Sequence, residues 1–266
     1  MELLDLGFSG WAFLTSGAAV AGWIDAVIGG GGLVLIPLIM AVAPQLAPAT
    51  ALATNKVAAV SGTASAAVTM VRKVRPPAGE LVRLSLVALV CSGIGAGAAA
   101  MIDKDVMRPL IIVLMVCAGA FVAFRPSFGT NESEGIRGGW RRWAALAAVA
   151  CIAFYDGIFG PGTGMFLIMA FTGIFSQNFL KSAAMAKVVN TCTNVGALCV
   201  FILGGHVIWA LALVLALAVA NVIGAQLGAR TVLGGGTKLI RYALLTLVVV
   251  MSIYLGIQQW GTTSAS

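Results

Sequence analysis

The stretch Gly22-Trp-Ile-Asp-Ala-Val-Ile-Gly-Gly-Gly-Gly32 decides how this chain folds, because it sets one carboxylate and four consecutive glycines in an apolar segment. Each glycine costs a helix about 1 kcal/mol relative to alanine, so Gly29 to Gly32 predict a helix break. Inside a membrane, unwound backbone is tolerated only where protein or a water-filled cavity surrounds it. The break therefore belongs in the interior of a bundle if the chain is a membrane protein.

The composition indicates a membrane protein. Of the 266 residues, 60% are hydrophobic and 9% are charged, whereas soluble domains carry about 25% charged residues. One transmembrane helix uses roughly 20 apolar residues, so the chain has enough for roughly eight to ten spans. These values exclude a soluble enzyme, a nucleic-acid-binding protein, a secreted disulfide scaffold and a disordered chain. They predict an all-α polytopic membrane protein.

Predominantly apolar runs divide the chain into two sets of about five helical segments. The first set is 8–28, 33–43, 49–71, 82–102 and 107–124, and the second is 143–158, 164–175, 182–203, 207–229 and 239–259. Segments 33–43 and 164–175 are too short to span a bilayer. Each follows a glycine cluster, so each is either half of a broken helix or part of a re-entrant hairpin.

An internal repeat relates the two sets. A shift of 131 residues takes Asp25 to Asp156 and Lys56 to Lys187. It also superposes glycines, among them Gly29 and Gly160, Gly31 and Gly162, Gly93 and Gly224, and Gly97 and Gly228. The pattern predicts a first transmembrane repeat at 1–124, a linker at 125–142 and a second repeat at 143–266. The glycines at 93, 95, 97, 224 and 228 are interpreted as sites of close helix packing.

The loop charges predict how the repeats are oriented. The loop Arg72-Lys73-Val74-Arg75 is basic, whereas its counterpart around His206 is not, and the bias is reversed in the next loop. This exchange predicts two inverted-topology repeats with their broken helices near the midplane, an arrangement typical of secondary transporters. Because basic loops remain on the cytoplasmic side, the linker is predicted inside and both termini outside.

No residue pattern indicates an enzyme or a cofactor. The five cysteines lie in apolar segments without metal-ligand spacing, and they are predicted to pack as small hydrophobic side chains. A lone histidine, His206, cannot supply a metal site, and no hydrolase or phosphate-loop motif is present.

Four ionisable residues lie well inside apolar sequence: Asp25, Lys56, Asp156 and Lys187. Each costs about 2.5–3.5 kcal/mol on insertion scales, so each needs a partner or a wet cavity. One interpretation is that Asp25–Lys56 and Asp156–Lys187 form ion pairs that lock helices. The other is that the lysines attract an anion while the aspartates orient them or carry protons. The two are compatible, since a ligand can compete for a pair, and Lys56 is also long enough to reach an interface.

The two glycine breaks are candidate anion sites. They comprise Gly29, Gly30, Gly31 and Gly32 in the first half, and Gly160, Gly162, Thr163 and Gly164 in the second. A helix that restarts after each break presents its N-terminal amides and positive dipole end to the interior. The alternative interpretation is close helix packing. Asn55 beside Lys56, and Asn190 with Thr191, either bind the oxygens of an oxyanion or bond neighbouring helices.

The run Gly22–Gly32, with Leu35-Ile36-Pro37 and Ala49–Asn55 after it, resembles the first repeat of the TauE/SafE sulfite exporter family, also called the toluene sulfonate uptake permeases. The run Gly157–Gly164 is similar to that family's second repeat, from whose glycines Pro161 and Thr163 depart. The resemblance covers nearly the whole chain. It implies movement of sulfite or organosulfonate anions across the bacterial cytoplasmic (inner) membrane.

Together these features predict a secondary transporter for a small sulfur-containing anion, such as sulfite, sulfoacetate or another organosulfonate. It would work by alternating access, with proton coupling by Asp25 and Asp156 as an option. The alternatives are a passive anion channel and a non-transporting membrane scaffold or sensor. The expected partners are the anion and the lipid bilayer, with no nucleic acid and no cofactor.

Overall fold

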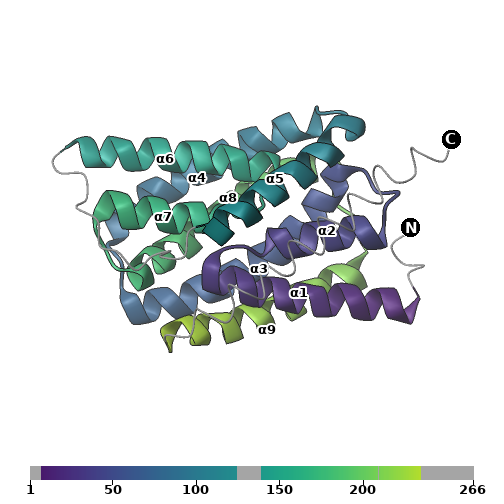
Figure 1. The fold of residues 1–266 in the computed structure, drawn as a ribbon, viewed down its shortest axis with the longest axis horizontal. Coiled ribbons are helices and arrows are strands. Elements are labelled where there is room, and N and C mark those ends of the chain that lie inside the picture. The colour runs from purple at the N-terminus through teal and green to yellow at the C-terminus, as the bar shows by residue number, and fades with distance from the viewer. Residues whose placement is uncertain (1–6, 125–138, 209, 235–266) are drawn as a thin grey trace.

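A computed structural model describes residues 7–124, 139–208 and 210–234, with the backbone alone for residues 104, 115 and 118–124, and this part is entirely helical (Figure 1). Four of its helices, α1, α4, α8 and α9, are long and apolar enough to cross a membrane. In chain order the helices are α1 (Phe8–Ile28), α2 (Gly32–Val42), α3 (Pro48–Val74), α4 (Ala78–Ala100), α5 (Lys104–Phe124), α6 (Trp140–Ile158), α7 (Thr163–Phe175), α8 (Phe179–Leu203) and α9 (Leu211–Leu233).

The predicted segments agree closely with the helices. Local chemistry explains several boundaries: Pro48 occupies the first turn of α3, and the Asn178 side chain caps α8 by accepting a hydrogen bond from the Lys181 amide at 3.0 Å. The segment predicted at 207–229 begins four residues later, at Leu211, because the connector before α9 is as apolar as the helix itself. The segment predicted at 239–259 lies outside the described residues.

The short helices are the returning arms of re-entrant hairpins. A side chain at Gly17 in α1 would meet Leu38 in α2, whereas Gly31 at the start of α2 lies against Asp25, so α2 runs back along α1. In the same way, Arg141 at the start of α6 lies over the ring of Phe175 at the end of α7, 5.2 Å from its centroid. Each hairpin therefore returns to the end of the bundle from which it began.

The helix contacts between the two halves occur in corresponding pairs, related by the 131-residue shift. Helix α1 packs on α9, and its counterpart α6 packs on α4. In both interfaces the two helices run in the same direction. Between α1 and α9, Ala19 contacts Gly224 and, one turn later, Trp23 contacts Gly228. In the other interface, Glu80 pairs with Arg141 near the start of both helices, and Gly95 meets Phe154 further along.

Further contacts give the directions of the remaining long helices that pack between the two halves. Helix α9 is also parallel to α3, since Ser61 bonds Ala218 and Thr69 bonds Gln226. Helix α8 runs with α4, and the short turn at 75–77 reverses the chain between α3 and α4. Helices α1, α3 and α9 thus run one way and α4, α6 and α8 the other. Corresponding helices run in opposite directions, as an inverted repeat requires.

Backbone contact between helices explains part of the glycine content. A Cβ atom on Gly95 would overlap the carbonyl oxygen of Phe154, and one on Gly224 would overlap that of Ala19. Gly228 is similarly close to Trp23, so the packing prediction is confirmed at these three positions. It is wrong for Gly97, where an added Cβ would come no nearer than 4.0 Å to Val200.

The cysteines are less buried than predicted. Cys117, Cys151 and Cys199 are exposed on the outside of the described bundle, and Cys91 and Cys192 are partly exposed. The prediction failed because the outer surface of a membrane protein is as apolar as its core, so hydrophobicity does not distinguish the two faces.

The two ends of the bundle differ in charge. The end at which α3 finishes and α4, α6 and α8 start, here called the basic end, carries a group of cations: Arg72, Lys73, Arg75, Arg83, Arg141, Arg142, Lys181 and Arg230. The opposite end, at the turn between α4 and α5, has the charge-balanced set Asp103, Lys104, Asp105 and Arg108. This asymmetry is the kind that fixes membrane orientation, and placing the basic end in the cytoplasm remains a prediction.

Gly95 and Gly97 provide a matched test of the helix contacts because they lie two residues apart in α4. Gly95→Ala is expected to destabilise the protein by about 1–3 kcal/mol, since its methyl group would force α6 away. Gly97→Ala has room for the methyl group and gains up to about 1 kcal/mol of helix propensity. Thermal unfolding in detergent should show a lower midpoint for Gly95→Ala only. Equal midpoints for the two variants would contradict the α4–α6 packing.

Candidate functional site

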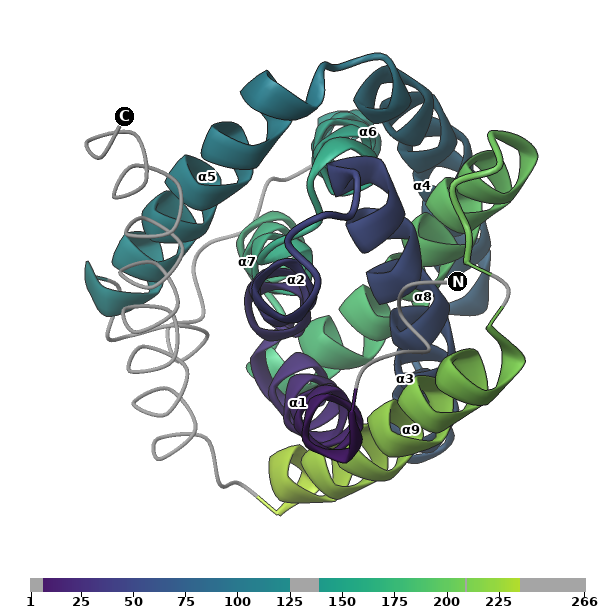
Figure 2. The same ribbon diagram turned by 90° about the vertical axis from the view of Figure 1, so that its right-hand side faces the viewer.

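The two helix breaks meet each other inside the bundle. Viewed along the helices, α6, α7, α2 and α1 lie in that order, with the two re-entrant arms at the centre (Figure 2). The amide of Gly164, at the start of α7, donates a hydrogen bond to the carbonyl oxygen of Gly29 at 3.1 Å. A Cβ atom on either glycine would overlap the backbone of the other. The predicted packing role and the predicted break are therefore both present at these glycines.

Three glycines in the breaks adopt left-handed backbone conformations. Their φ angles are 79° at Gly29, 89° at Gly160 and 80° at Gly162. Residues with a side chain enter this region only at an energetic cost, whereas glycine enters it freely. Gly29 ends α1 in this conformation, and Gly162 precedes the first turn of α7.

Two ion pairs connect the halves of the chain at these breaks. The Nζ atom of Lys56 in α3 lies 2.6 Å from Oδ2 of Asp156, and Nζ of Lys187 in α8 lies 3.0 Å from Oδ2 of Asp25. The predicted pairing within each half, Asp25 with Lys56 and Asp156 with Lys187, is therefore wrong. Because the breaks lie back to back, each lysine reaches the break of the other half.

The charged side chains are buried. The exposed fraction is 2% for both Lys56 and Asp156, and 0% for Lys187 against 15% for Asp25. The interpretation that Lys56 extends to a membrane interface is wrong, because its ammonium group ends inside the bundle. Removing one partner of such a pair leaves an uncompensated charge, which typically costs 3–5 kcal/mol.

Each aspartate also bonds the start of its own re-entrant helix. Oδ1 of Asp156 accepts a hydrogen bond from the Thr163 hydroxyl at 2.7 Å, and Oδ1 of Asp25 accepts one from the Gly31 amide at 3.3 Å. The positive ends of α7 and α2 thus face carboxylates of the protein itself. Thr163, a departure from the all-glycine pattern, provides in the second half a hydroxyl donor that Gly32, its counterpart, lacks.

The lysines have further acceptors. Lys56 Nζ donates to Oδ1 of Asn194 at 3.0 Å, and Lys187 Nζ donates to the backbone carbonyl of Asp25. Asn194 was not among the predicted site residues. Its signal is in the sequence, because it follows Lys187 by seven residues, two helical turns, and so lies on the same face of α8.

Two other predicted residues, Thr191 and Asn190, make hydrogen bonds within their own helix, α8. The Thr191 hydroxyl donates to the carbonyl of Lys187 at 2.8 Å, and Oδ1 of Asn190 accepts from the Thr193 hydroxyl at 3.2 Å. Asn190 and Asn55 are both buried, at 4% and 5% exposure. Their roles as ligands of an oxyanion stay predictions.

Tyr155 is a second residue that the sequence reasoning missed. Its hydroxyl donates to the carbonyl of Pro161 at 2.8 Å and so braces the second break. Its ring also lies edge-on to Phe166 of α7, with 5.7 Å between centroids. The signal available in the sequence was its position directly before Asp156.

The described residues include no group of three or more His, Cys, Asp or Glu side chains that could hold a metal ion. The chemistry that this site supports is therefore carried by two carboxylates, two ammonium groups and the amides at two helix starts. Such groups bind anions and protons.

Comparison with known proteins adds independent information. The sequence profile described as "Sulfite exporter TauE/SafE" matches residues 14–255. The chain is 39% identical to the "Probable membrane transporter protein YfcA" of Escherichia coli (strain K12), over 88% of this chain and 85% of the relative. It is 32% identical to the "Probable membrane transporter protein ORF9" of Sinorhizobium sp, over 96% and 94% of the two chains. The comparison with solved structures finds no match.

The crossed pairing can be tested with charge-removing variants. Lys56→Met should destabilise the protein by about 3–5 kcal/mol, because it leaves the Asp156 carboxylate buried without its cation. Adding Asp156→Asn should recover much of that loss, since the amide carries no charge. Adding Asp25→Asn should instead lower stability further, because Lys187 then loses its partner. Thermal unfolding in detergent measures all three, and recovery by Asp25→Asn in place of Asp156→Asn would contradict the crossed pairing.

Proposed function

Because this chain belongs to the sulfite exporter TauE/SafE family and is a membrane transporter, we propose that it is a secondary transporter for a small sulfur-containing anion. Sulfite and organosulfonates such as sulfoacetate are the proposed substrates. The site lies between the two helix breaks, and access to it alternates between the two sides of the bacterial inner membrane. Both termini are proposed to lie outside.

The observation that carries this proposal is that the protein's own carboxylates occupy two anion positions. Asp25 and Asp156 each accept a bond from a lysine of the other half and a bond from the start of a re-entrant helix. A sulfite or sulfonate group offers the same negative oxygens as a carboxylate. It can therefore replace an aspartate at a lysine and a helix start without leaving either unsatisfied.

The two pairs differ in how accessible they are. The Asp25 side chain is 15% exposed, whereas Asp156 is 2% exposed and holds the Thr163 hydroxyl at 2.7 Å. This difference supports Lys187 as the lysine that first exchanges its aspartate for substrate. The Lys56–Asp156 pair, which also includes Asn194, would keep the other half of the site closed during that step.

Charge balance supports proton coupling through the displaced aspartate. When an anion takes the place of the Asp25 carboxylate at Lys187, an unpaired buried carboxylate is left, and desolvation favours its neutral form. Uptake of one proton by Asp25 neutralises it, so one proton accompanies each monovalent anion. The net charge of the site then stays the same with and without substrate.

The antiparallel course of corresponding helices supports alternating access. If the two halves are inverted repeats, each can adopt the conformation of the other. The Lys56–Asp156 pair would then become the more exposed one, and it would be accessible from the opposite side of the membrane. Substrate would enter by exchange with one aspartate and leave after the halves have interchanged their conformations. The extensive burial of both pairs favours this carrier over a passive channel.

Transport in liposomes tests the proposed role of the lysines. Purified protein should move sulfite or a short sulfonate, and unlabelled substrate on the far side should accelerate uptake, as a carrier requires and a pore does not. Lys187→Ala should lower uptake at least tenfold, because the anion loses its cation. Lys73→Ala removes an exposed cation from the basic end and should leave uptake unchanged. Wild-type uptake in both Lys56→Ala and Lys187→Ala would remove these residues from the site.

Proton coupling needs a sulfonate as the probe, because sulfite itself carries protons at neutral pH. With a pH-sensitive dye inside the liposomes, sulfonate entry through the wild type should acidify the interior. Asp25→Asn should still exchange labelled for unlabelled sulfonate but should no longer move protons, since an amide cannot take one up. Acidification that persists in both Asp25→Asn and Asp156→Asn would show that neither aspartate carries the proton.

A further inference from the structure

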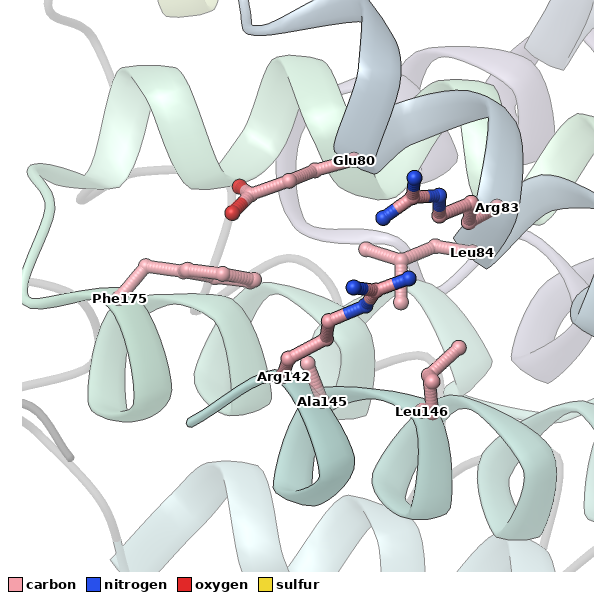
Figure 3. A pocket seen from close by; sticks show the side chains of 7 residues that line it. All are labelled: Glu80, Arg83, Leu84, Arg142, Ala145, Leu146 and Phe175. Atoms are coloured by element: carbon pink, nitrogen blue, oxygen red, sulfur yellow. The ribbon is translucent and has the colours of Figure 1, made fainter. Parts of the chain in front are cut away.

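Two arginines face each other at the basic end of the bundle, outside the site described above. Arg83 in the second turn of α4 and Arg142 in the first turn of α6 both line one hollow between these helices. Figure 3 shows their guanidinium groups directed into the same space, with Leu84 between them, Leu146 below and Phe175 at its edge.

The hollow has an excess of positive charge. Its carboxylate, Glu80, pairs with Arg141, whose NH2 atom lies 3.7 Å from Oε1 of the glutamate. Within the described part of the chain, neither Arg83 nor Arg142 has a carboxylate at ion-pair distance. Two like charges that share one hollow repel each other, and an anion bound between them would remove that repulsion.

The surroundings of the hollow are suited to an amphiphile. The walls of the hollow include the apolar side chains of Leu84, Leu146 and Phe175. The outer surface of α4 continues with Val82 and Leu86, which are 58% and 61% exposed, as expected of side chains that contact lipid tails. Beside the hollow, Trp140 and Trp143 on α6 are 72% and 66% exposed, and tryptophan is enriched where head groups meet the hydrocarbon.

We propose that this hollow binds the phosphate of an anionic phospholipid. Arg83 and Arg142 would hold the phosphate oxygens through charge-assisted hydrogen bonds, and the acyl chains would lie along the exposed apolar faces of α4 and α6. Basic hollows between transmembrane helices on one side of a bilayer are suited to such head groups. Because the lipid would join α4 of the first half to α6 of the second, it would stabilise their parallel contact.

Native mass spectrometry of the protein, purified with defined lipids, tests the proposal. The wild type should retain phosphatidylglycerol in preference to phosphatidylcholine. The double variant Arg83→Gln/Arg142→Gln should retain at least fivefold less phosphatidylglycerol. The control Arg72→Gln/Lys73→Gln removes the same charge from exposed positions at the same end of the bundle, and it should bind lipid as the wild type does.

Three results would overturn the proposal: equal retention of the two lipids by the wild type, equal losses in the two double variants, or complete displacement of phosphatidylglycerol by millimolar glycerol phosphate. The last result would identify a site for free anions in place of a lipid site. A thermal-shift assay tests the proposal independently of mass spectrometry. Added phosphatidylglycerol should raise the unfolding midpoint of the wild type and of the control, but not that of Arg83→Gln/Arg142→Gln.

Discussion

The pairing of each buried lysine with an aspartate of the opposite half is the interaction on which the rest of the structure depends. The Lys56–Asp156 and Lys187–Asp25 pairs place four formal charges inside an apolar bundle. If the halves separated, all four would lose their partners in an environment where each isolated charge is costly. The crossed pairs therefore add two buried ionic contacts to an interface that otherwise consists of small-residue packing and neutral hydrogen bonds, such as that from Asn221 to the Ala18 carbonyl.

The glycine breaks make those pairs geometrically possible. Because α1 and α6 stop inside the bundle, their backbones turn back, and the contact between Gly29 and Gly164 brings the two breaks within hydrogen-bond distance. Each break places a carboxylate at the positive end of a re-entrant helix and within reach of the lysine from the other half. A continuous helix would offer neither free amides nor this close backbone approach.

Much of the fold was predictable because its determinants are local or periodic. Apolar runs predicted the helices, and the shift that superposes Asp25 on Asp156 and Lys56 on Lys187 predicted that the two halves correspond. The partners of the charges were not predictable, because equal spacing within each half does not say which break a lysine faces. The outward position of Cys151 was hidden for a similar reason, since lipid-facing and buried positions have the same polarity.

In the candidate site, too, the sequence identified individual residues but not the contacts between them. The lysines and aspartates stood out individually because charges are costly in a membrane, and the glycines stood out because clustered glycines break a helix, so the sequence identified both. Asn194 and Tyr155 are ordinary in composition, and only the folded arrangement shows that one bonds Lys56 and the other braces the second break. The re-entrant course of α2 and α7 likewise emerged only from their contacts with α1 and α6.

In the proposed mechanism, a transported anion competes with the protein's own carboxylates for the crossed lysines. The most direct measurement is the distance from Lys187 Nζ to Asp25 Oδ2, which is 3.0 Å here, in a cryo-electron microscopy structure determined with saturating sulfite. If the anion displaces Asp25, sulfite oxygens should lie against Lys187 and the Asp25 carboxylate should be beyond ion-pair distance, more than about 4 Å away. Sulfite bound elsewhere, with both crossed pairs intact, would contradict this mechanism.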